Sequence, residues 1–92
     1  MFFVYVLFSE ACGKRYVGQT DDLERRLREH NDPLSNVRKF TSRNAGPWRL
    51  VWSEMFDSRR EAMAREKWLK SGVGREWLDQ RSIGRASPPP AD

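Results

Sequence analysis

An unbroken apolar run near the N-terminus limits what this chain can fold into. Residues Phe2–Phe8 are all aromatic or aliphatic and are rich in β-forming side chains. A strand with one face in water alternates polar and apolar residues, whereas a strand buried on both faces is continuously apolar. The run therefore predicts a central strand.

The residues that follow predict a hairpin. Ser9–Gly13 is polar and ends in glycine, which adopts positive φ at little cost and so suits a tight turn. Lys14–Gly18 is then the returning strand. We expect this strand to end at Gly18, where the backbone turns into a helix.

A capped helix is predicted next. Either Thr20 or Asp21 can cap it, and Asp21 with Glu24 has the spacing of a capping box. Acidic residues in the first turn also suit the positive end of a helix. Asn31–Pro33 ends the helix, because proline cannot continue it.

A long polar connection separates this helix from a third strand. Residues Pro33–Pro47 have no strand or helix pattern, and a loop of this length in a small domain is often functional. Trp48–Phe56 is enriched in Trp, Leu and Val and predicts a strand. Basic side chains in the loop are candidates for phosphate contacts: Arg38, Lys39 and Arg43.

Two more helices are expected toward the C-terminus. Ser58–Glu61 is a second capping box and begins a helix that runs to Lys70, where Ser71-Gly72 ends it. Arg75–Arg81 predicts a short third helix. The proline-rich residues 83–92 have too little apolar surface to pack and are predicted to be a disordered tail after a domain of residues 1–82.

Composition limits the compartment and the partners. Ninety-two residues make one domain, and a net charge of +4 favours a polyanion, nucleic acid before an anionic membrane. A single cysteine, Cys12, excludes an internal disulfide and fits a reducing compartment. The N-terminal run is too short for a membrane span and lacks the features of a signal peptide. We expect a cytoplasmic protein with no membrane partner.

The helix after the hairpin directs two polar side chains toward its apolar side. At about 100° per residue, Arg26 and His30 fall within about one quadrant of Leu23, while Arg25 points the opposite way. An arginine on an apolar face is unfavourable unless it meets an anion. The alternative is an arginine that extends past the leucines to water, which is common.

The second capped helix carries a carboxylate on its apolar side. Glu66 falls between Ala62, Met63 and Leu69, and a carboxylate in such a place needs a cation, a metal or a hydrogen-bond network. One interpretation is an ion pair with Arg26 or a neighbouring lysine. The other is a ligand for Mg²⁺, which takes oxygen ligands and retains several waters.

Two tyrosines lie on the two predicted hairpin strands. Tyr5 and Tyr16 lie on one face in one register, but a shift of one residue would place them on opposite faces. The turn length alone leaves both registers open.

The motifs together resemble the GIY-YIG nuclease family, specifically its small stand-alone, single-domain endonucleases. The resemblance covers about residues 2–70: Phe3-Val4-Tyr5 stands for the first motif and Tyr16-Val17-Gly18 for the second. Arg26 and His30 match the family's helix arginine and the histidine after it. Glu66 matches the family's metal-binding glutamate. The leading glycine of the first motif is missing, and we find no counterpart of the asparagine that larger members carry after the glutamate helix.

The resemblance implies a chemistry for these residues. Mg²⁺, for which Mn²⁺ can substitute, would be held by Glu66 and would stabilise the leaving oxygen of a scissile phosphate. Tyr5 or Tyr16 would orient and deprotonate the attacking water, and which of them is the base is left open. Arg26 would bind the phosphate, and His30 would orient a tyrosine or contact phosphate. Further backbone phosphates would be bound by Lys14, Arg38, Lys39 and Arg43.

We therefore predict an α/β (α+β) domain. It has a three-stranded antiparallel sheet flanked by helices, in the order strand–strand–helix–strand–helix–helix. The predicted function is a metal-dependent endonuclease that cleaves DNA phosphodiester bonds in repair or recombination, with selectivity for branched or damaged DNA left open. One alternative is a nucleic-acid-binding module whose cleavage is weak or needs a protein partner. A second is a protein–protein adaptor with an exposed tryptophan patch.

Overall fold

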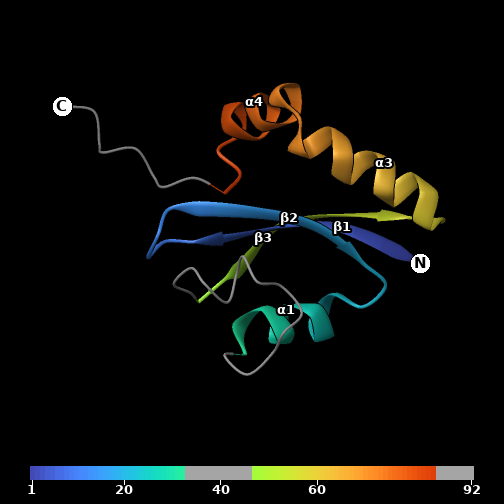
Figure 1. The fold of residues 1–92 in the computed structure, drawn as a ribbon, viewed down its shortest axis with the longest axis horizontal. Coiled ribbons are helices and arrows are strands. Elements are labelled where there is room, and N and C mark those ends of the chain that lie inside the picture. The colour runs from blue at the N-terminus through green and yellow to red at the C-terminus, as the bar shows by residue number, and fades with distance from the viewer. Residues whose placement is uncertain (33–46, 85–92) are drawn as a thin grey trace.

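The computed structural model describes residues 1–32 and 47–84 as a three-layer arrangement around one antiparallel sheet (Figure 1). Helix α1 covers one face of the sheet, and helices α3 and α4 cover the other. The strand order is β2-β1-β3, so the predicted antiparallel sheet and the element order are confirmed. The elements are β1 (Phe2–Ser9), β2 (Lys14–Thr20), α1 (Leu23–Asn31), β3 (Arg49–Phe56), α3 (Arg59–Lys70) and α4 (Gly72–Gln80).

Strand β1 is the centre of the molecule. It pairs with β2 on one side and with β3 on the other, and residues 4–9 of it are buried. The run is continuously apolar because both of its faces meet a helical layer. The pairing of β1 with β3 shifts register between Val6 and Leu7 of β1, and such an irregularity adds local twist to the sheet.

The hairpin turns at Gly13 as predicted, but its second strand is longer than predicted. Gly13 has φ of +66°, and its N–H donates to the Ser9 carbonyl at 2.8 Å. Strand β2 continues through Gly18 to Thr20, where the Thr20 hydroxyl accepts a hydrogen bond from Asp22 N–H at 3.1 Å. The turn into α1 is therefore made after Thr20, and the predicted strand end at Gly18 is wrong.

The helix starts also differ from the prediction in detail. The side chain that caps α1 is Asp22, which accepts from Arg25 N–H at 3.1 Å, because Thr20 is already used in the preceding turn. Ser58 caps α3 as predicted. Helix α4 begins at Gly72, three residues before the predicted Arg75, because Ser71 both ends α3 and caps α4.

The two faces of the sheet bury separate clusters. The cluster under α3 and α4 is aliphatic at its centre: Val4, Val6, Val17, Ala62, Leu69, Leu78 and Ile83. The cluster under α1 has Tyr5, Leu7 and Trp48, with Tyr16, Leu23 and Leu27 packed against it. Met63, expected on the apolar side of α3, is 53% exposed instead. No helix in the described parts of the chain is long and apolar enough to cross a membrane.

Candidate active site

The pairing of β1 with β2 brings the two tyrosines to one face. Tyr5 is opposite Gly18 and Leu7 is opposite Tyr16, so Tyr5 and Tyr16 are diagonal neighbours on the face that α1 covers. Their ring centroids lie 6.2 Å apart. Of the two registers that the sequence allowed, the structure has the one that gathers the tyrosines.

Gly18 makes room for this pair. A Cβ atom built on Gly18 would lie 2.6 Å from Tyr5 Oη and 2.9 Å from Tyr16 Cε1, closer than real Cβ contacts allow. Both rings therefore fill the space above the glycine. Gly18 does not need unusual backbone angles here; it is required because the tyrosines occupy the volume of a side chain.

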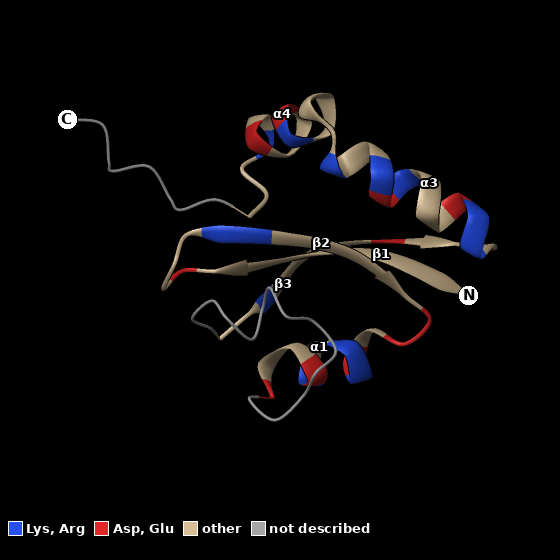
Figure 2. Ribbon diagram, in the orientation of Figure 1, with Lys and Arg blue, Asp and Glu red and all other residues tan. Residues whose placement is uncertain are grey.

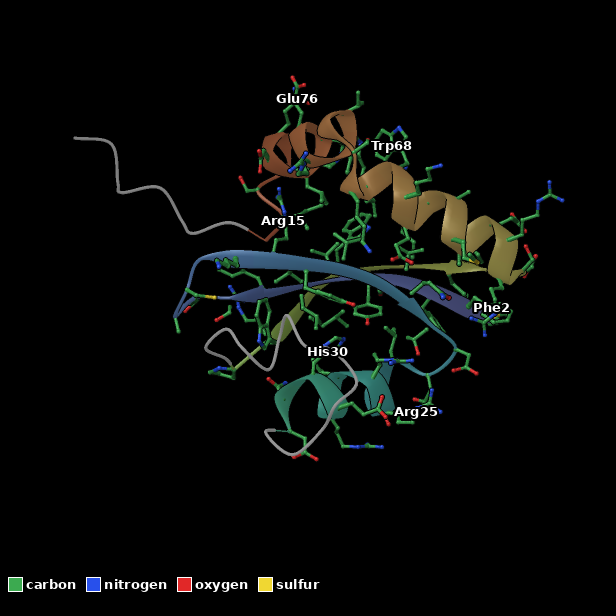
Figure 3. All side chains as sticks on the ribbon, viewed as in Figure 1. Phe2, Arg15, Arg25, His30, Trp68 and Glu76 are labelled. Carbon is green, nitrogen blue, oxygen red and sulfur yellow. The ribbon has the colours of Figure 1, made fainter. Side chains whose placement is uncertain are left out.

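His30 completes an aromatic triad that we define as Tyr5, Tyr16 and His30. Its side chain rises from α1 toward the sheet (Figure 3) and only 4% of the residue is exposed. His30 Nε2 and Tyr5 Oη are hydrogen-bonded at 2.8 Å, and the imidazole ring lies 4.8 Å from the Tyr16 ring. The predicted orientation of His30 toward the sheet is confirmed.

Arg26 lies one turn before His30 and faces the same way. The Arg26 side chain is 20% exposed. The Arg25 side chain is 46% exposed and forms a surface ion pair with Asp21. Arg26 Nε is 3.7 Å from Glu29 Oε1, which is too long for a hydrogen bond. Both atoms are buried and neither has a hydrogen-bond partner in the described chain. The Arg26 guanidinium thus retains donor capacity that suits an oxyanion.

Glu66 lies on the opposite side of the sheet from the aromatic triad, on α3. It is half-buried, and its Oε2 accepts a hydrogen bond from Lys70 Nζ at 2.6 Å. Of the partners considered from the sequence, the structure therefore has the neighbouring lysine rather than Arg26. Because Lys70 is 51% exposed, the pair contributes only about 0.3–0.5 kcal/mol to stability.

Two cavities lie between α3 and the edge of the sheet formed by β2. A cavity of about 420 Å³ on the α3 side is lined by Arg15, Tyr16, Val17, Leu69, Lys70 and Arg75. Another, of about 480 Å³, is lined by Gln19, Met63, Ala64, Glu66, Lys67 and Lys70. Lys70, the partner of Glu66, lines both cavities, whereas the Tyr16 ring lies on the other face of the sheet and no contact in the described residues joins Glu66 to the triad.

The second of these cavities offers oxygen atoms to a hard cation. Besides the Glu66 carboxylate, Gln19 Oε1 is buried and accepts no hydrogen bond from the described residues. Magnesium prefers oxygen ligands and binds through one or two carboxylates with its remaining positions filled by water and phosphate. No cluster of three or more His, Cys, Asp or Glu suited to a metal occurs within residues 1–32 and 47–84. The donor set therefore fits a weakly held, largely hydrated Mg²⁺.

The predicted phosphate-binding residues fall into two groups. Lys14 is exposed at the start of β2, in the basic segment visible in Figure 2. Arg15, beside it, is held by Asp79 and by the Ile83 carbonyl. The other three predicted residues lie outside the described residues: Arg38, Lys39 and Arg43.

Sequence reasoning missed residues that hold the site in place. The Asn31 side chain donates to the Trp48 carbonyl at 2.9 Å and accepts from Trp48 N–H at 2.7 Å. This clamp joins the end of α1 to the start of β3 and keeps Trp48 in the cluster with Tyr5. In the sequence, an asparagine at a helix end indicates only that the helix stops. Its role as a clamp could not be predicted, because the residue that it contacts lies 17 positions away in the chain.

The tryptophans do not form the exposed patch that the adaptor interpretation requires. Trp48 is 2% exposed. Trp52, Trp68 and Trp77 are half-buried and pack edge to face. Arg65 lies over Trp68 and Trp77 and pairs with Glu54 of β3 at 2.9 Å. These contacts fix α3 and α4 to the sheet.

Several known proteins are similar to this chain over part or most of their length. The chain is 42% identical over 55 residues to UPF0213 protein CPE1444 of Clostridium perfringens, covering 60% of this chain but only 56% of that relative. It is 44% identical over 69 residues to UPF0213 protein NP_0776A of Natronomonas pharaonis, covering 75% of this chain and 76% of that one.

A solved structure and a family model agree with this likeness. The solution NMR structure of UPF0213 protein BH0048 from Bacillus halodurans matches with a TM-score of 0.51 and 32% identity, over 91% of this chain and 88% of that one. The model of the GIY-YIG catalytic domain matches residues 1–77, which include the triad, Arg26 and Glu66. The chain belongs to the GIY-YIG family of nuclease domains.

Proposed function

We propose that this protein is a divalent-metal-dependent endonuclease that hydrolyses DNA phosphodiester bonds in repair or recombination. The observation that carries the proposal is the aromatic triad packed over Gly18, with Arg26 one turn away on the same helix. Membership of a nuclease family supports DNA as the substrate. The basic side chains at the β2 edge suit a phosphate backbone.

Tyr16 is the better placed of the two tyrosines to activate water. It is half-buried on the edge strand β2, whereas Tyr5, on the central strand, is 1% exposed and is hydrogen-bonded to His30. We assign Tyr16 Oη to hold the attacking water and accept its proton. Tyr5 and His30 are positioning residues, because their rings pack against the Tyr16 ring and hold it in place.

Arg26 and Glu66 supply the two charges that the reaction needs. As water attacks phosphorus and the bond to the leaving oxygen breaks, negative charge grows on the phosphate oxygens, and Arg26 donates hydrogen bonds to them. Glu66, with Gln19 beside it, would hold a Mg²⁺ or Mn²⁺ ion. When bound, such an ion supplies Lewis-acid stabilisation of the leaving oxygen.

The test is nicking of supercoiled plasmid and of branched DNA with Mg²⁺ or Mn²⁺. The wild type is compared with Arg26→Ala and Glu66→Ala, and Arg25→Ala and Glu76→Ala serve as matched controls. Arg25 is adjacent but points to solvent, and Glu76 is an exposed glutamate on α4 (Figure 3). We expect activity in the wild type and both controls, and at least a 100-fold loss in the two site variants and with EDTA.

A second candidate is favoured by one contact. Because Glu66 is already paired with Lys70, the carboxylate has a charge partner without any metal. A DNA-binding module with weak or partner-dependent cleavage would retain this pair permanently. It predicts salt-sensitive DNA binding by all five proteins with no cleavage by any of them. Cleavage that persists in both site variants would instead contradict the site assignment.

A further inference from the structure

Lys70 occupies an unusual position among the residues at the β2 edge. It is the last residue of α3, and its ammonium holds Glu66 Oε2 at 2.6 Å. It also lines both cavities, the one that contains Glu66 and Gln19 and the one that contains Tyr16 and Arg75. Lys70 is therefore the side chain common to the cavity of the carboxylate and to the basic cavity beside it.

A divalent cation and the Lys70 ammonium compete for the same oxygen. A cation bound at Glu66 would place two positive groups within a few ångströms of each other, which is unfavourable. The Lys70 ammonium can move away from Glu66 at little cost, because the side chain is 51% exposed, long and flexible, and ends in three rotatable donors. The other cavity that Lys70 lines is basic, with Arg75 also in its wall, and so suits a phosphate.

We propose that Lys70 is an exchangeable partner of Glu66, an inference that rests on the proposed function. The incoming divalent cation displaces the Lys70 ammonium from Glu66. The released ammonium then binds a phosphate oxygen of a DNA strand in the basic cavity beside Arg75. Arg15 does not compete for this role, because it is engaged by Asp79 and the Ile83 carbonyl. Metal binding and strand binding are thereby coupled through one side chain.

The exchange predicts opposite effects of one substitution on two affinities. Lys70→Met removes the competitor, so Mn²⁺ should bind about twofold more tightly, the amount expected for loss of an exposed helical ion pair. The same substitution should weaken binding of a short DNA duplex, measured with Ca²⁺ present, by at least threefold. The matched control is Lys67→Met, which removes the same charge from the same helix and cavity wall without breaking the Glu66 pair.

The experiment is a Mn²⁺ titration of the full chain without DNA, followed by paramagnetic broadening of the NMR signals of residues 18–19 and 66–70. Tighter Mn²⁺ binding and weaker DNA binding in Lys70→Met than in Lys67→Met support the exchange. Equal affinities in the two variants would overturn it while leaving the metal site intact. Broadening that is the same in the wild type and in Glu66→Gln would instead remove Glu66 as a metal ligand, and with it both proposals.

Discussion

At the scale of single residues, the site depends on one missing side chain. Gly18 lies opposite Tyr5 on the neighbouring strand, and the space that a Cβ would take is filled by the Tyr5 hydroxyl and the Tyr16 ring. The close approach of the two rings to His30 follows from this. The glycine of the second motif is thus explained by packing against both tyrosines.

Gly18→Ala should therefore disturb the triad as well as the fold. The new methyl group must push Tyr5 and Tyr16 away, and such overpacking costs about 1–3 kcal/mol. Urea unfolding should show this loss, and the NMR signals of the His30 ring should shift. A variant with wild-type stability and unchanged His30 signals would show that the space above Gly18 is not filled as the structure has it.

The two tyrosines should differ in their effect on rate. If Tyr16 accepts the proton from water, Tyr16→Phe should lower kcat by about 10²–10⁴-fold, the usual contribution of a general base. Tyr5→Phe removes the hydrogen bond to His30 Nε2 and leaves the proposed base in place, so we expect a loss of about tenfold, the usual effect of one hydrogen bond. The measurement is the single-turnover nicking rate. The opposite ranking would make Tyr5 the base.

At the scale of elements, the junction of α3 and α4 determines how the helical layer closes over the sheet. Ser71 ends α3 by donating its N–H to the Trp68 carbonyl, and its hydroxyl accepts from Gly74 N–H at 3.2 Å to begin α4. Gly74 lies against the backbone of α3, where a Cβ would collide with the Trp68 carbonyl and lie 2.5 Å from Leu69 Cα. The two helices approach this closely because position 74 has no side chain.

Two glycines of α4 should respond differently to alanine. Gly74→Ala should destabilise the protein by more than about 2 kcal/mol, because the obstruction is backbone that cannot rotate away. At Gly72 no atom lies within 4 Å of the position that a new methyl group would take, so Gly72→Ala should stabilise the protein by about 0.4–1 kcal/mol. Thermal unfolding of both variants checks this, and similar changes in Tm would contradict it.

At the scale of the whole molecule, the stability of the fold comes from apolar burial and does not require the proposed metal ion. The buried clusters on the two faces of the sheet are aliphatic and aromatic, and Glu66 has a lysine partner at the surface. The fold therefore gains its stability from apolar burial, which scales with the area removed from water. The proposed cation would contribute to the reaction rather than to the core.

Removal of metal should accordingly stop cleavage without unfolding the protein. We expect EDTA to abolish nicking while Tm changes by less than about 2 °C, since a weakly bound ion adds little free energy to the native state. Addition of Mg²⁺ in excess of EDTA should restore the activity. A large drop in Tm with EDTA would reveal a structural metal, in conflict with the site proposed at Glu66.

Helical periodicity explains why part of the site could be predicted. In α1 and α3 the rotation per residue is set by local backbone geometry, so the choice of Arg26 over Arg25 and the inward direction of His30 need no knowledge of the rest of the chain. The same reasoning placed Met63 on the wrong side, because α3 packs through Ala62 and Leu69 and leaves Met63 in water.

The chain by itself determined the order of the elements and the orientation of α1. Apolar continuity, turn glycines and capping side chains act over only a few residues, so they can be read locally. The tertiary structure decided the register that gathers Tyr5, Tyr16 and Gly18, the Asn31 clamp on Trp48, and the cavity that Gln19 and Glu66 share at the β2 edge. These contacts join residues far apart in the chain, and their geometry follows from how the sheet and its two helical layers pack together.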